Sequence, residues 1–167
     1  MSAIAMRVLA GAVAGLLALP AAAQFPSGQP SLLPPDQAFR LSARALDPST
    51  LEVRFDIADG YYLYRDRLGF KVAPVPAGRI DLPPGKVKHD DFFGDVETYR
   101  GAVVLRVPLA HAGKAGERLT IHADSQGCAD VGVCYPPNPQ QLDVVLPRAG
   151  SPPGDYVEAA KPKGWFN

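Results

Sequence analysis

Proline and glycine are spread so widely through this chain that long helices have little room. The sequence contains 18 prolines and 16 glycines, and few stretches of ten residues after residue 23 lack both. A proline inside a helix removes a backbone hydrogen bond and clashes with the preceding turn. Only two segments, 35–44 and 155–160, are compatible with a helix, each of about two or three turns at most.

The segments between these breakers alternate apolar and polar residues. In 51–57 every second residue is apolar, which is typical of a strand with one buried face. Similar short runs occur at 39–43, 61–64, 102–109, 119–123 and 142–146. Turn-forming residues separate most of these runs, so the pattern predicts an all-β antiparallel sandwich.

The first 23 residues have the composition of a secretory signal peptide. Arg7 precedes an apolar run over 8–19, and Pro20 and three alanines follow it, as in an A-x-A cleavage site. The apolar run is shorter than the roughly 20 residues that a membrane-spanning helix needs. We therefore expect cleavage after Ala23 and a soluble, exported protein that begins at Gln24.

The rest of the chain is predicted to fold as one domain over 36–146. The stretches 24–35 and 147–167 are rich in Pro, Ser and Gly, so we expect flexible flanks there, with a short helix possible in the second. The formal net charge is +0, which gives no reason to expect binding to nucleic acid or to an anionic membrane. We expect a monomer.

Cys128 and Cys134, the two cysteines of the chain, are predicted to form a disulfide. A tight turn over 130–132 would bring their Cα atoms within about 4.4–6.8 Å, as a disulfide requires. In an exported protein a structural bridge is the default. Yet so short a loop gains only about 2 kcal/mol by the chain-entropy argument, and a disulfide in a turn is open to an attacking thiolate. The spacing alone leaves a structural and a reactive role open.

Two aromatic segments also carry a choice of roles. Phe92 and Phe93 stand side by side in a polar loop, where they either cover a functional group or anchor the core. Tyr62 and Tyr64 alternate onto one face of a strand, where they either line a site or fill the core with their hydroxyls at the rim. In both cases core packing is the commoner role, and the residues alone leave both open.

Taken together, these segments resemble the amino-terminal domain of the DsbD family, the periplasmic end of a transmembrane thiol-disulfide reductase. The resemblance covers nearly all of the segment predicted to fold. The stretches that carry it, in the order of the family, are GYYLYR at 60–65, DDFFG at 90–94 followed by ETYRG at 97–101, and QGCADVGVCYPP at 126–137.

The resemblance implies an immunoglobulin-like sandwich with a redox-active disulfide and neither metal nor cofactor. Cys134 would form the mixed disulfide with a partner protein, and Cys128 would resolve it. The implied cap loop consists of Asp90, Asp91, Phe92, Phe93 and Gly94, with Phe92 over the sulfurs. The implied site-lining residues are Tyr62, Tyr64, Asp90 and Asp91, together with Asp130 inside the cysteine loop.

Carboxylates beside the cysteines bear on the reactivity of this implied site. A nearby carboxylate disfavours the charge of a thiolate, so Asp90, Asp91 or Asp130 would slow the reaction of the resting dithiol with random disulfides. A docked partner that displaces Phe92 would restore the reaction, which gives specificity through access.

The resemblance also implies a direction of electron flow. The reduced pair would act as a protein-disulfide reductase in the periplasm, on disulfide isomerases of the DsbC type and on thioredoxin-like proteins of cytochrome c maturation. In the family a membrane domain and a thioredoxin-like domain follow, and neither occurs before Asn167. For a complete chain we would expect a membrane-embedded or thioredoxin-like reductase acting in trans.

Two other classes of function stay open at this stage. The sandwich could be a binding module in which the disulfide only shapes a loop. Alternatively, the two cysteines and one of His89, His111 or His122 could carry copper(I). None of these residues shows a recognisable metal-ligand spacing, so we predict no metal site.

Overall fold

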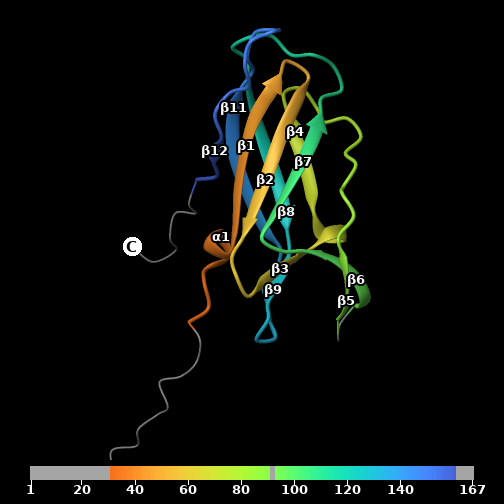
Figure 1. The fold of residues 1–167 in the computed structure, drawn as a ribbon. Coiled ribbons are helices and arrows are strands. Elements are labelled where there is room, and N and C mark those ends of the chain that lie inside the picture. Colours follow the sequence, from red (N-terminus) through yellow and green to blue (C-terminus); the bar gives the residue numbers. More distant parts are fainter. Residues whose placement is uncertain (1–30, 91–92, 161–167) are drawn as a thin grey trace, which may run out of the picture. The chain divides into compact units, whose positions relative to one another are not determined.

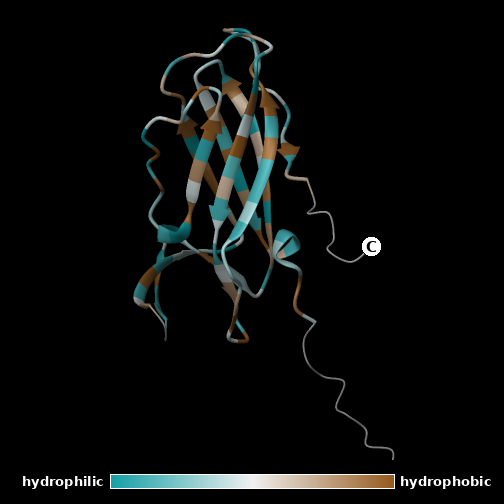
Figure 2. Cartoon of the chain, turned by 180° about the vertical axis from the view of Figure 1, so that it is seen from behind, coloured by the Kyte–Doolittle hydropathy of each residue, from teal (hydrophilic) through white to brown (hydrophobic). Residues whose placement is uncertain are grey.

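Alternating side chains place one face of each long strand in a shared core. In the computed structural model, which describes residues 31–90 and 93–160, strand β2 (Thr50–Ile57) buries Leu51, Val53, Phe55 and Ile57 and leaves the residues between them partly exposed. Figure 2 shows the same alternation as bands of brown and teal along the strands. Removing these apolar side chains from water is the main favourable term in folding.

Two antiparallel sheets form a sandwich around this core. One has the strand order β12-β1-β2-β7 and the other β11-β8-β4, and they lie face to face in Figure 1. The main apolar cluster draws side chains from both sheets. Besides β2, the strands of these two sheets are β1 (Phe39–Asp47), β4 (Gly69–Ala73), β7 (Ala102–Pro108), β8 (Arg118–Ser125), β11 (Asn138–Val145) and β12 (Val157–Glu158). The predicted all-β antiparallel sandwich is therefore confirmed.

A third sheet at one end of the sandwich carries both cysteines. Its strand order is β10-β9-β3-β6-β5, and its strands lie toward the lower end of Figure 1. The strands are β3 (Tyr61–Tyr64), β5 (Lys86–Asp90), β6 (Gly94–Tyr99), β9 (Gly127–Ala129) and β10 (Val133–Cys134). Because β3 pairs with both β9 and β6, it brings segments far apart in the sequence together at this end.

Helices are shorter than the sequence pattern allows. Within the predicted segment 35–44 only α1 (Pro35–Ala38) is helical, because the residues from Phe39 onward alternate into the core as β1. A single 3-10 turn, η1 (Arg65–Arg67), follows β3. In the described part of the chain, no helix has the length and apolar character needed to cross a bilayer.

The carboxyl-terminal segment differs from the expected free tail with a short helix. Val157 and Glu158 pair with Ala43 and Ser42 of β1, and the Tyr156 hydroxyl donates a hydrogen bond to Glu52 over 2.7 Å. A helix of only six residues is marginal in water, whereas the edge of β1 offers partners for the backbone. The chain thus stays in contact with the sandwich at least as far as Ala159, whose N–H bonds to the carbonyl of Leu41.

Candidate active site

A tight hairpin places the two cysteines directly opposite each other. Cys128 on β9 pairs with Cys134 on β10, and their sulfurs are bonded, with the Cα atoms 4.0 Å apart, just below the predicted range. Gly132 takes a φ of 87° in the connecting turn, a conformation that favours glycine. The predicted turn over 130–132 therefore closes the loop.

The two cysteines differ sharply in exposure. Cys128 is 0% exposed and packs with Tyr62 and Tyr64 in a small cluster of its own. Both residues of β10, Val133 and Cys134, are exposed. Among the described residues, Cys134 therefore offers the accessible sulfur of the bond, and access to the sulfur is what attack by a thiolate requires.

Tyr62, Tyr64 and Asp90 surround the buried sulfur. The Tyr64 hydroxyl lies 2.6 Å from Asp90 Oδ2 and 3.1 Å from Cys128 Sγ, and it lies 3.9 Å from Cys134 Sγ. Tyr62 donates a second, longer hydrogen bond of 3.3 Å to the same carboxylate oxygen. Although Asp90 is 4% exposed, these donors compensate the loss of water around its carboxyl oxygens.

Burial controls the protonation of the central tyrosine. Burial raises the pKa of Tyr64, and the hydrogen bond to Asp90 raises it further because an adjacent carboxylate disfavours a phenolate. Tyr64 is consequently a neutral phenol. Its hydroxyl carries one proton and lies within reach of both the Asp90 carboxylate and Cys128 Sγ. The sequence placed Tyr62 and Tyr64 on one face of a strand, and the structure puts that face against Cys128.

Part of the expected cap loop can be placed beside Tyr64. The ring of Phe93 meets the ring of Tyr64 edge-on, with 5.4 Å between the centroids, and its backbone N–H bonds to Asp90 Oδ1 over 3.2 Å. Phe93 is 44% exposed, so it is not a core anchor. Gly94, with a φ of 71°, begins β6. Asp91 and Phe92 lie outside the described residues.

Asp130 stands apart from the role expected for a carboxylate beside the sulfurs. Its two oxygens accept hydrogen bonds of 2.9 and 2.6 Å from the Arg100 guanidinium, which holds the pKa of Asp130 below its usual range. Arg100 also lies 5.0 Å from the ring centre of Tyr62. Arg100 therefore balances the negative charge of Asp130, and a role of Asp130 beside the sulfurs stays a prediction.

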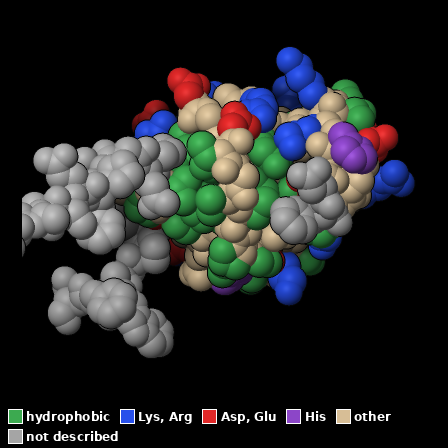
Figure 3. All heavy atoms as spheres, turned by 90° about the horizontal axis from the view of Figure 1, so that it is seen from below, with side chains coloured by type: hydrophobic (Ala, Val, Ile, Leu, Met, Phe, Trp, Pro, Cys, Tyr) green, Lys and Arg blue, Asp and Glu red, His purple; other side chains and the backbone are tan. Residues whose placement is uncertain are grey.

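Sequence reasoning missed the cations at this end of the sandwich. Lys88 and Arg100 both lie over the ring of Tyr62, at 4.9 and 5.0 Å, and Arg67 lies 4.8 Å from the ring centre of Phe93. No local pattern marks these residues, because their positions depend on strand pairing. Figure 3 views this end and shows blue Lys and Arg side chains beside a green apolar area.

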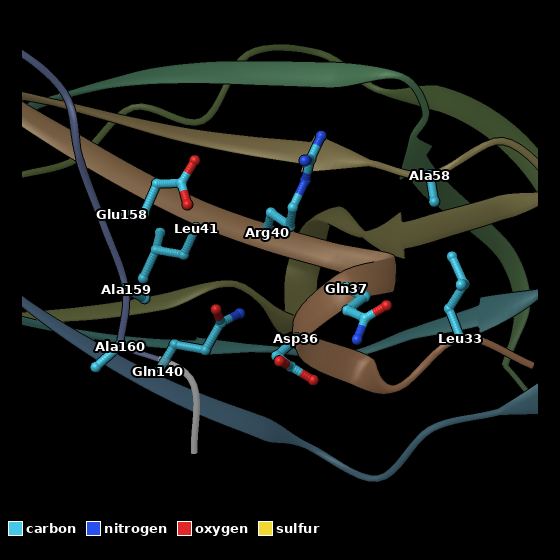
Figure 4. Close-up of a pocket in the computed structure, with 10 residues that line it drawn as sticks. All are labelled: Leu33, Asp36, Gln37, Arg40, Leu41, Ala58, Gln140, Glu158, Ala159 and Ala160. Atoms are coloured by element: carbon cyan, nitrogen blue, oxygen red, sulfur yellow. The ribbon is translucent and has the colours of Figure 1, made fainter. Parts of the chain in front are cut away.

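Metal-type ligand clusters and a hollow with a polar lining are the features to set against the position of the cysteines in the described part of the chain. Across residues 31–90 and 93–160, no three His, Cys, Asp or Glu side chains gather as metal ligands would. A hollow of about 440 Å³ lies beside α1, β1 and β11, with Asp36, Arg40, Gln140 and Glu158 among its lining residues (Figure 4). No cysteine lines that hollow.

The comparison with known protein families identifies this arrangement. The family described as "Thiol:disulfide interchange protein DsbD, N-terminal" matches residues 29–146. The chain belongs to the DsbD N-terminal domain family. It is a DsbD-type domain with a cysteine pair, as the four sequence stretches had implied.

Individual DsbD relatives match most of this chain. It is 50% identical over 149 residues to the thiol:disulfide interchange protein DsbD of Ralstonia nicotianae, an alignment that covers 86% of this chain and 23% of the relative. DsbD 1 of Pseudomonas aeruginosa is 40% identical over 152 residues, which cover 83% of this chain and 25% of that protein. The chain thus spans about a quarter of the length of these relatives.

Solved DsbD structures share the fold. The reduced N-terminal domain of Neisseria meningitidis DsbD matches with a TM-score of 0.66 and 32% identity, over 77% of this chain and 96% of that one. A chain from the complex of the meningococcal DsbD and PilB N-terminal domains matches with a TM-score of 0.55 and 34% identity. The match covers 74% of this chain and 94% of that one. The predicted immunoglobulin-like sandwich is confirmed.

Proposed function

We propose that this domain passes electrons from a reductase to oxidised partner proteins through Cys128 and Cys134. The observation that carries the proposal is the asymmetry of the pair, since an exposed Cys134 is bonded to a fully buried Cys128. A structural disulfide gains nothing from such asymmetry. A relay gains a sulfur that meets the partner and a second sulfur that no partner can reach.

The reaction follows from this arrangement in two balanced steps. In the reduced domain, the thiolate of Cys134 attacks a disulfide of the partner, so that a mixed disulfide forms and one partner sulfur leaves as a thiolate. The thiol of Cys128 then loses its proton and attacks Cys134 Sγ, which releases the second partner sulfur. The partner gains two electrons and two protons, and the domain returns to the disulfide.

We infer a periplasmic location and thioredoxin-like partners. The signal-like first 23 residues support export. The meningococcal DsbD N-terminal domain has been solved in the reduced form and in complex with the PilB N-terminal domain, which supports a redox cycle with a protein partner. We propose disulfide isomerases of the DsbC type and thioredoxin-like proteins of cytochrome c maturation as substrates, and a membrane-embedded or thioredoxin-like reductase as the donor.

Trapping of the mixed disulfide tests the proposal. In a Cys128→Ser variant the exposed Cys134 remains and the resolving thiol is gone, so an adduct with an oxidised periplasmic thioredoxin-like protein should accumulate on a non-reducing gel. Cys134→Ser is the matched control, because the remaining Cys128 is 0% exposed and should form no adduct. Absence of an adduct with Cys128→Ser would favour a binding module with a structural disulfide.

The midpoint potential of the pair separates the same two functions without a partner. Structural disulfides of exported proteins have potentials below about −300 mV, whereas relay proteins lie at higher values. We expect the higher range for Cys128 and Cys134. A potential below that limit would assign the bond a structural role.

A further inference from the structure

Three aromatic rings pack under the base of the cysteine hairpin. Tyr135, the residue after Cys134, meets Phe39 edge-on with 5.7 Å between the centroids, and Tyr61 meets Phe39 in the same way at 6.0 Å. The centroids of Tyr61 and Tyr135 are 6.2 Å apart. Edge-to-face contacts of this kind hold rings in defined orientations.

Both tyrosine hydroxyls of this group bind one residue near the amino-terminal end of the described chain. The N–H of Leu33 donates a hydrogen bond of 2.8 Å to the Tyr61 hydroxyl, and the Tyr135 hydroxyl donates one of 2.7 Å to the carbonyl of Leu33. The Leu33 side chain also packs against the main core. Burial raises the pKa of Tyr135 to about 12, so its hydroxyl remains a donor at neutral pH.

The backbone of Tyr135 is also held in place, by two hydrogen bonds. Its N–H bonds to the carbonyl of Gly127 over 2.9 Å, and its carbonyl accepts a bond of 3.3 Å from the Gln126 side chain. Gly127 in turn leaves no room for a side chain, because a Cβ there would lie 2.7 Å from the Phe39 ring. The strands of both cysteines are therefore fixed to the same aromatic group.

We propose that the backbone of Leu33, bound by two tyrosine hydroxyls, acts as a strap that positions Cys134 for bond formation with Cys128. The strap consists of the backbone of Leu33 and the two hydroxyls that bind it, so Tyr61 and Tyr135 are positioning residues rather than catalytic ones. The Tyr135 ring also meets Phe39, and the Tyr64 hydroxyl lies 3.9 Å from Cys134 Sγ, so the strap adds to two other contacts between this hairpin and distant parts of the sequence. Tyr135 and Leu33 are 102 residues apart, so the strap couples the hairpin to the start of the fold.

The physical basis is the effective concentration of one thiol at the other. Holding two reacting groups in place converts their encounter into an intramolecular step and removes much of its entropic cost. If Tyr135 is held less tightly, Cys134 can take more positions in the reduced and mixed-disulfide states, but the Cys128–Cys134 disulfide still restricts it to one. Closure of the Cys128–Cys134 bond then becomes less favourable, and attack of Cys128 on the mixed disulfide becomes slower.

Removal of single hydroxyl groups tests the strap in the full chain. Tyr135→Phe and Tyr61→Phe each delete one bond to Leu33 and keep the ring. In a glutathione buffer, each variant should lower the equilibrium constant for closing the disulfide three- to tenfold, which raises the midpoint potential by about 14–30 mV. Because both hydroxyls bind the same residue, the double variant should change the constant by less than the product of the two single effects.

Tyr156→Phe is the matched control. It deletes a tyrosine hydrogen bond of the same length, 2.7 Å to Glu52, at a residue just before β12. We expect its midpoint potential to equal that of the unmodified protein. A second readout is the lifetime of the mixed disulfide with a small thiol, which should lengthen in Tyr135→Phe and stay unchanged in Tyr156→Phe.

The outcomes separate the strap from the proposed function on which it rests. If Tyr135→Phe and Tyr61→Phe lower thermal stability but leave both the potential and the lifetime unchanged, the tyrosines are structural and the strap is wrong. If Tyr135→Phe does not fold, Tyr61→Phe decides between these outcomes alone. The glutathione equilibrium needs no protein partner, so failure of the partner-trapping experiment would refute the relay and leave this measurement valid.

Discussion

The hydroxyl oxygen of Tyr64 lies 3.1 Å from Cys128 Sγ. This hydroxyl has one proton, and its shorter contact of 2.6 Å to Asp90 Oδ2 takes that proton. The Tyr64 oxygen then faces Cys128 Sγ with a lone pair, which can accept a hydrogen bond but cannot donate one. A disulfide sulfur has no hydrogen to donate, whereas a Cys128 thiol does. The contact therefore becomes a hydrogen bond only when the pair is reduced.

Tyr64→Phe should make the midpoint potential more negative. The substitution removes a hydrogen bond that stabilises the dithiol, for which about 1 kcal/mol is typical, and this corresponds to about 20 mV for a two-electron couple. Tyr62→Phe is the control, because its hydroxyl donates to Asp90 and should affect both redox states alike. Equal potentials for Tyr64→Phe and the unmodified protein would show that the contact does not distinguish the two states.

Strand alternation was enough to predict the sandwich, because burial of one face follows from the sequence itself. The runs at 51–57 and 102–109 correspond to β2 and β7 within one or two residues. The segment at Val157 and Glu158 could not be predicted in the same way. Two residues show no periodicity, and their strand exists only because the edge of β1 is there to pair with.

Local sequence was also enough to place Tyr62 and Tyr64 on one strand face, since side chains alternate along any strand. The resemblance to DsbD domains added the place of that face beside the cysteines. Arg100 shows what neither source supplied. It lies beside Tyr62 because β3 pairs Leu63 with Tyr99 of β6, and it reaches Asp130 because β9 pairs on the other side of β3. Such contacts depend on strand register, which one sequence does not reveal.

The Arg100–Asp130 ion pair predicts a small loss of stability in acid. The pKa of Asp130 is lower in the folded protein than its unfolded value of about 3.9. The stabilising contribution is therefore complete above that value and is lost as the pH falls through the lower, folded pKa. Because the two side chains are 43% and 45% exposed, solvent screening limits the contribution to about 1 kcal/mol or less.

NMR titration of the Asp130 carboxyl carbon checks this prediction. Arg100→Gln should return the pKa of Asp130 toward its ordinary value, and added salt should do so in part for the unmodified protein. If the pKa of Asp130 were the same with and without Arg100, the ion pair would not be the cause of the shift.

Gly127→Ala should destabilise the domain through overpacking. A Cβ at this position would clash with the backbone carbonyl oxygen of Tyr62 and lie 2.7 Å from the Phe39 ring, so the paired strands must move apart. Overpacking of this kind typically costs about 1–3 kcal/mol. Gly69→Ala is the matched control in another strand, because its nearest neighbouring atom is 3.8 Å away. Urea unfolding of the oxidised proteins compares the two, and equal effects would contradict the close approach of β9 to Phe39.

The two phenylalanines of the expected cap loop should have separable effects. Phe93→Ala removes an edge-on contact with Tyr64, so we expect a loss of about 1 kcal/mol in the free energy of unfolding.

The resemblance to DsbD domains instead assigns the covering of the sulfurs to Phe92. On that basis Phe92→Ala should speed the reaction of the reduced domain with a small aromatic disulfide, because the reaction depends on access to the thiolate. Stopped-flow absorbance measures this rate directly. An unchanged rate for Phe92→Ala would remove Phe92 from the mechanism and leave protection of the pair to the burial of Cys128.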